Sequence, residues 1–229
     1  MRKLAIALLM MLVIASGNAQ SGAYSSKKGT SKPNPMIENA QLACRLARYG
    51  YDHKSPTALV EAARILTDQP FHEAEVVQKQ PSRGSEGRKH TRPMEMDVEK
   101  LLADARAFCG KDEEKLALVE SCIQDLSHAK SKGAVSGPAI VQERVFANSE
   151  VIFFIKVDGK GDLQISVEGD GSTDLDLDVF YGSDYGQRIF DESAGDRCNV
   201  SFSPKSDQTV KVVVKNWGTE YNDFILMHN

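Results

Sequence analysis

An alternation of apolar and acidic side chains over residues 174–179 constrains the fold more than any other stretch. The alternating residues are Leu175, Leu177 and Val179 in one set and Asp174, Asp176 and Asp178 in the other. A β-strand points successive side chains to opposite faces, so this stretch predicts a strand with one apolar and one acidic face. A strand that is buried on one face only is typical of an antiparallel sheet.

The same two-residue period recurs, between turns rich in Gly, Asn and Asp, throughout residues 139–229. It predicts short strands at residues 140–146, 151–157, 162–167, 174–181, 187–190, 198–202, 209–214 and 224–227. Many short strands joined by tight turns, with no helix of useful length among them, are typical of a two-sheet sandwich. We therefore expect residues 139–229 to form an all-β sandwich.

Residues 35–130 follow a helical period instead. Apolar residues recur three and four positions apart, which predicts helices over residues 35–49, 55–66, 97–109 and 112–126. Their short connections predict two antiparallel helical hairpins. The expected fold class is therefore α+β in two domains, with about four helices followed by the sandwich. Residues 131–138, rich in Gly and Ser, are the expected hinge.

The first residues have the pattern of a targeting segment. Arg2 and Lys3 precede an apolar run at residues 4–15, and small residues follow at 17–19. This pattern predicts a secretory signal peptide over residues 1–19, and hence a secreted or periplasmic protein. A membrane anchor is disfavoured because the apolar run is too short to span a bilayer comfortably. Residues 20–34, rich in Ser, Gly, Lys and Pro, are the expected disordered leader.

Charge is unevenly distributed along the chain. Residues 139–229 hold 16 acidic and 8 basic side chains, which argues against a nucleic-acid partner because that would need a basic surface. A loop over residues 79–93 is basic instead, and it contains Lys79, Arg83, Arg88, Lys89, His90 and Arg92. The loop fits either an arm that contacts an anionic surface or a solvated connection.

Four cysteines, Cys44, Cys109, Cys122 and Cys198, permit disulfides in an exported chain. A bridge between Cys109 and Cys122 is disfavoured, because the two would lie roughly 15 Å apart along the second hairpin, beyond disulfide reach. Cys44 with Cys109 is then the expected pair, and free buried thiols are the alternative.

Aspartates near residues 170–178 are candidate calcium ligands, because calcium takes several oxygen ligands. The candidates are Asp170, Asp174, Asp176 and Asp178. A strand alone cannot surround a cation, so loop carboxylates such as Asp191 or Asp196 would have to contribute. The alternative is that these side chains bond turn amides or face solvent.

Trp217 is the single tryptophan, and it lies in a predicted loop near the end of the chain. With Asn216, Tyr221 and Asn222 it forms a candidate surface for a sugar or peptide, because aromatic side chains make large and rigid contacts. The alternative is that Trp217 covers one end of the sandwich while the asparagines bond turn backbone.

Catalytic motifs are incomplete in this sequence. His72 and Glu73 begin like a zinc-binding helix, but Val76 stands where a second histidine would be required. Ser136 lies in a glycine-flanked stretch, although not at the nucleophile position of a hydrolase elbow. We therefore expect a protein that is not an enzyme.

Three ordered blocks in the C-terminal half resemble a bacterial pre-peptidase C-terminal (PPC) domain. They are G-D-G-S-T-D-L-D-L-D-V-F-Y at 169–181, D-R-C-N-V-S-F-S-P at 196–204 and V-V-V-K-N-W-G-T-E-Y-N-D-F-I-L at 212–226. The resemblance implies a jelly-roll-like, non-catalytic sandwich of the kind that accompanies secreted hydrolases. Some members of that family bind calcium, collagen or polysaccharide. The helical half resembles the poorly characterised helical partner of such sandwiches in small secreted bacterial proteins.

These patterns together predict a secreted, non-catalytic binding or accessory protein. Its partner would be an extracellular or periplasmic polysaccharide, protein or envelope component. One alternative is a structural protein whose sandwich stabilises the helical domain. A further alternative is a hydrolase with an unrecognised site.

Overall fold

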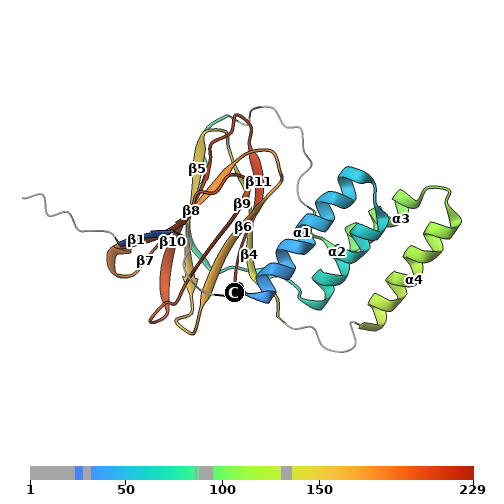
Figure 1. The fold of residues 1–229 in the computed structure, drawn as a ribbon, viewed down its shortest axis with the longest axis horizontal. Helices are drawn as coiled ribbons and strands as arrows, with labels where there is room; N and C mark the ends of the chain where they lie inside the picture. The colour runs from blue at the N-terminus through green and yellow to red at the C-terminus, as the bar shows by residue number, and fades with distance from the viewer. Residues whose placement is uncertain (1–23, 28–31, 86, 88–94, 130–135) are drawn as a thin grey trace, which may run out of the picture.

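The computed structural model describes residues 24–27, 32–85, 87, 95–129 and 136–229. Four helices lie beside a two-sheet sandwich (Figure 1), so the predicted α+β architecture is confirmed. The predicted signal peptide lies outside the described residues, as do parts of the predicted leader, basic loop and hinge. None of the described helices is both long and apolar enough to cross a membrane.

The four helices begin and end close to the predicted positions. They are α1 (Pro35–His53), α2 (Pro56–Asp68), α3 (Val98–Cys109) and α4 (Glu113–Ala129). Side-chain caps begin three of them. Asn34 accepts from the Met36 amide, Asp97 accepts from the Lys100 amide, and Asp112 accepts from the Lys115 amide. Their apolar faces share one core that contains Leu59 and Leu101. Figure 1 shows α1 nearest to the sandwich and α4 farthest from it.

Each strand predicted between residues 139 and 229 is present. The strands are β4 (Ala139–Val145), β5 (Ser149–Val157), β6 (Leu163–Gly169), β7 (Leu175–Tyr181), β8 (Gln187–Asp191), β9 (Arg197–Phe202), β10 (Gln208–Asn216) and β11 (Asn222–His228). They join β1 (Tyr24–Lys27), β2 (His72–Glu73) and β3 (Val76–Gln80) in two sheets. Sheet A has the order β1-β8-β7-β10-β5-β3, and sheet B has the order β2-β4-β11-β6-β9.

Inward side chains of both sheets fill the core of the sandwich. Leu175, Leu177 and Val179 of β7 are fully buried there, as their alternation predicts. Phe153 of β5 and Phe224 of β11 meet edge to face with ring centroids 6.3 Å apart, which joins the two sheets. The other face of β7 therefore carries its aspartates, as predicted.

Strands β1, β2 and β3 are not predicted by the sequence. β1 lies in the stretch expected to be a leader and pairs with β8. β2 and β3 lie in the connection that follows α2, where β2 pairs with β4 and β3 pairs with β5. The side chains of β2 and most of those of β3 are exposed, so no apolar alternation marks these edge strands. Lys79, expected in the basic loop, lies on β3 and pairs with Glu143 of β4. The connection after α2 thus contributes to the sandwich.

Candidate functional site at the loop end around Trp217

The two sets of residues predicted as sites meet at one end of the sandwich. Three loops lie there, at residues 170–174, 192–196 and 217–221. The Trp217 amide donates to the Asp174 carbonyl at 3.3 Å, and the Gly195 amide donates to the Asp174 carboxylate at 2.6 Å. Asp174 thus joins all three loops.

Trp217 is the most exposed aromatic side chain of this end, with 59% of its surface accessible. Its indole N–H donates to the Asp176 carboxylate on the outer face of β7. Lys215 of β10 lies opposite Asp176 in the strand register. The indole is therefore fixed at its polar edge while its ring surface stays open to solvent.

The carboxyl group of Asp176 has a perturbed acidity. Partial burial is the largest cause and raises its pKa, and the negative charges of Glu192 and Asp174 raise it further. The hydrogen bond from Trp217 and the charge of Lys215 act in the opposite direction. The net direction is upward, so Asp176 holds its proton more readily than an ordinary aspartate.

Asp178 is buried although it lies on the outward face of β7. Arg188 Nε of β8 donates to its carboxylate at 2.6 Å, and Lys215 Nζ lies 2.7 Å from its other oxygen. Only 2% of its side chain is exposed. The sequence predicts the outward direction of Asp178 but misses the two cations that cover it. The lysine spacing in β10 was the available signal, because a two-residue period places Lys211 and Lys215 on one face.

Asp170 and Asn222, which are also predicted site residues, form hydrogen bonds with the backbone of the loops. Asp170 accepts from the Ser172 and Asp223 amides, at 3.0 and 3.1 Å. Asn222 accepts from the Asp170 amide and donates to Thr173 at 3.0 Å. Asp170 and Asn222 are both buried. They fix the turn between β6 and β7, which is the alternative interpretation that the sequence left open.

Asn216 and Tyr221 have similar structural roles. The Asn216 amide group donates to the Glu220 carbonyl at 2.7 Å, and its oxygen accepts from the Gly218 amide at 2.8 Å. Tyr221 is 8% exposed, and the Arg144 guanidinium lies 3.8 Å from its ring centroid. Among the four residues predicted as a binding surface, Trp217 alone presents a large exposed area.

The predicted calcium ligands point to separate partners. Asp170 bonds a turn, Asp174 bonds the Gly195 amide, Asp176 bonds the indole and Asp178 bonds two cations. Within the described part of the chain, no three Asp, Glu, His or Cys side chains form a metal-binding group. The structure therefore identifies no residue as a metal ligand, and calcium binding stays a prediction from the sequence.

All four cysteines are free thiols in this structure. Cys44 packs with Ile225 and Met227, whereas Cys109 lies in the helical core and its thiol donates to the Ala105 carbonyl. Cys44 faces the sandwich because the α1 face that carries it covers sheet B. The predicted bridge between Cys44 and Cys109 is therefore not formed.

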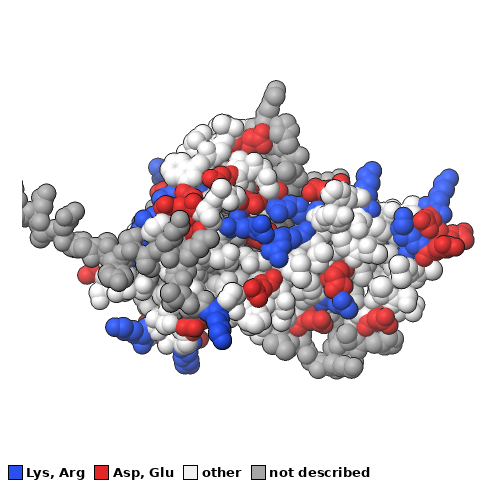
Figure 2. Space-filling view, viewed as in Figure 1, with Lys and Arg blue, Asp and Glu red and all other residues white. Residues whose placement is uncertain are grey.

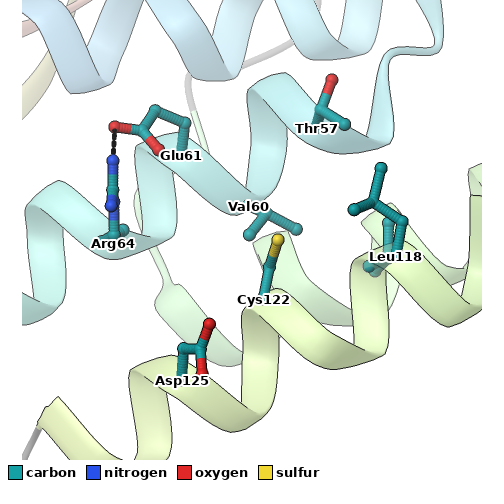
Figure 3. A pocket seen from close by; sticks show the side chains of 8 residues that line it. Thr57, Val60, Glu61, Arg64, Leu118, Cys122 and Asp125 are labelled. Carbon is teal, nitrogen blue, oxygen red and sulfur yellow. Dashed lines mark hydrogen bonds and ion pairs between the residues drawn. The ribbon is translucent and has the colours of Figure 1, made fainter.

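A groove between α2 and α4 is a feature that the sequence does not predict. Figure 3 shows Val60 of α2 and Cys122 and Leu118 of α4 lining it. Glu61 and Arg64 form an ion pair of 2.6 Å at its edge. Its volume is about 210 Å³, below the roughly 300–1,000 Å³ of ordinary small-molecule sites. This groove is therefore small for a small-molecule site.

Comparisons with known proteins leave the class of protein open. No protein-family model and no curated protein matches this sequence. One solved structure that is similar is the "Solution NMR structure of a de novo designed double-stranded beta-helix". It is 13% identical, the match covers 39% of this chain and 97% of that chain, and the TM-score is 0.26. A similarity of this size supports no argument about fold or function, so the PPC resemblance stays a prediction.

Proposed function

We propose that this chain is a secreted, non-catalytic binding protein that uses Trp217 as a platform for an extracellular or periplasmic polysaccharide. The observation that carries the proposal is the exposed indole, which is 59% accessible and held at its N–H by Asp176. An aromatic ring fixed in this way makes a large contact with an apolar sugar face at little cost in side-chain entropy. Export rests on the pattern of residues 1–19.

The groups around the indole suit polar ligands. Asp176 and Lys215 lie side by side on the outer face of sheet A, and Asp174 lies in the adjoining loop. A few polar groups next to an aromatic surface give orientation and specificity for sugar hydroxyls. Because the carboxylates of Asp174 and Asp178 are engaged with structural donors, we propose binding and not catalysis.

Retention on an array of polysaccharides and envelope proteins tests this proposal. We expect the full chain to be retained by a polysaccharide, and Trp217→Ala to weaken retention at least about tenfold, as removal of a central aromatic contact does. Tyr49→Ala is the matched control, because Tyr49 is 54% exposed but lies on α1. Equal retention of Trp217→Ala and the parent chain would refute the platform.

A structural role is the second candidate, and one observation favours it. Ile37 and Ala40 of α1 are buried against Ile225 and Met227 of sheet B. The sandwich thus covers an apolar face of the helical domain. Under this alternative the full chain binds none of the polymers or proteins on the array, and Trp217→Ala has no effect in any assay of binding.

A further inference from the structure

The helical domain contacts the loops of the candidate site directly. Arg48, on the last turns of α1, donates from Nη1 to the Gly169 carbonyl at 2.8 Å and to the Asp196 carboxylate at 3.1 Å. Its side chain is only 28% exposed. Gly169 ends β6, directly before the loop at residues 170–174, and Asp196 ends the loop before β9. One guanidinium therefore ties two loops of the sandwich to the helices.

Further hydrogen bonds extend from these two loops toward Trp217. The Asp196 carboxylate oxygen that accepts from Arg48 also accepts from the Gly171 amide at 2.6 Å. Next to it, the Gly195 amide donates to Asp174, whose carbonyl accepts from the Trp217 amide. The contacts run without a break from α1 to the loop that carries the exposed indole.

The packing around Gly171 shows how closely Arg48 follows this loop. Gly171 has a φ of +90°, a conformation that favours glycine. A Cβ atom at this position would lie 3.3 Å from Arg48 Nη1. The guanidinium thus lies against the loop backbone as well as bonding Gly169, directly before this loop, and Asp196.

Other charged side chains surround Arg48 where α1 packs against sheet B. Figure 2 shows basic atoms gathered between the sandwich and the helices. Glu168 of β6 is buried there, 3.7 Å from Arg48 and 3.8 Å from Arg45 of α1. Neither carboxylate oxygen of Glu168 accepts a hydrogen bond from the described residues. Arg48 Nη1 thus bonds the backbone and side chain next to the two loops, while Glu168 lies behind the guanidinium without a hydrogen bond to it.

We propose that Arg48 is a positioning residue through which the helical domain sets the shape of the ligand surface around Trp217. The helical domain then acts on binding without touching the ligand. The effect on affinity rests on the proposed function, whereas the effect on loop order does not. Removing the guanidinium should loosen residues 169–174 and 195–196 and with them the support of Trp217.

Hydrogen exchange on the full, ligand-free chain tests the positioning step. Arg48→Met keeps much of the side-chain length and removes the donors. We expect the Gly171 and Gly195 amides to exchange about tenfold faster or more, because hydrogen bonds to charged groups are lost. Amides of β5 and β10 should keep their protection. Arg45→Met is the matched control, because Arg45 lies on the same helix beside Glu168 and makes neither loop bond.

The same variants, assayed for retention on the polysaccharide array, test the link to binding. We expect Arg48→Met to weaken retention and Arg45→Met to leave it unchanged. Unchanged exchange at Gly171 and Gly195 in Arg48→Met would overturn the inference whether or not a ligand is found. Faster exchange in Arg48→Met with unchanged retention would show that Arg48 orders the loops but does not influence binding. If Trp217→Ala retains ligand normally, the proposed function fails, and the exchange data still decide the role of Arg48.

Discussion

Asp178 on sheet A and Glu168 on sheet B are both buried outward-facing carboxylates, but they are held in opposite ways. Asp178 receives Arg188 and Lys215 within hydrogen-bond distance, at 2.6 and 2.7 Å. Glu168 has Arg45 and Arg48 at 3.8 and 3.7 Å and no hydrogen bond from the described residues. Burial is the main cause that raises the pKa of Glu168 to about 7. The two cations near Glu168 therefore do not fully offset its desolvation, and neither of them donates a hydrogen bond to its carboxylate.

The largest expected effect belongs to the well-bonded carboxylate. Asp178→Ala leaves Arg188 and Lys215 beside each other without their shared partner, so we expect a loss of about 3 kcal/mol in the free energy of unfolding. Urea denaturation measures it. Asp158→Ala, at an exposed position in the same sandwich, is the control and should change stability little. Equal losses in both variants would show that Asp178 is not held as described.

Glu168→Gln should have a smaller effect that depends on pH. The folded pKa of about 7 lies above the ordinary value of 4.5, so the folded chain retains a proton that the unfolded chain releases. The stability that the folded chain has while Glu168 is protonated is fully present below pH 4.5, and it is lost as the pH rises to about 7. We expect the parent chain to lose about 2 kcal/mol across that window, and Glu168→Gln to lose markedly less.

Denaturation series across that pH window, with Glu143→Gln as the control on the same sheet, measure this difference. If the free energy of unfolding depended on pH equally in the parent chain and in Glu168→Gln, the described difference between Glu168 and Asp178 would be wrong, because Glu168 would then titrate like an exposed carboxylate.

Asn222→Ala should cost about 1–2 kcal/mol, because the buried amide of Asp170 loses its acceptor. Thermal unfolding measures the loss, and hydrogen exchange at Asp170 locates it. A variant as stable as the parent chain would mean that the turn between β6 and β7 does not depend on Asn222.

The smallest effect on stability is expected at Trp217. Because most of this side chain is already exposed, Trp217→Ala should change the free energy of unfolding by no more than about 0.5 kcal/mol. The same urea series measures it. A loss comparable with that of Asp178→Ala would favour the alternative in which Trp217 covers the end of the sandwich.

Much of the fold was predictable from the sequence because burial on one face leaves a period in the chain. The alternation in β7 and the helical periods in α1 and α2 gave those elements within a few residues. Strand β3 was not predictable, because an edge strand with exposed side chains leaves no such period.

The site was predictable only in part. The sequence marks Trp217 and Asp176 separately, but their hydrogen bond depends on the register between β7 and β10. Arg48 was missed altogether, because it lies 121 residues before Gly169 and reads as one more polar position on a helix. Contacts between distant elements depend on how the two domains pack. Neither the helical period nor the two-residue strand period of the sequence predicts that packing.

A fluorescence titration of the single tryptophan tests whether Trp217 is the contact surface for a polysaccharide. The full chain is titrated with soluble fragments of each polysaccharide on the array. We expect, for at least one of them, a saturable blue shift of Trp217 emission as the indole leaves water, together with weakened retention of Trp217→Ala. Emission that stays unchanged with every fragment, including those of any polymer that retains the chain, would contradict this expectation.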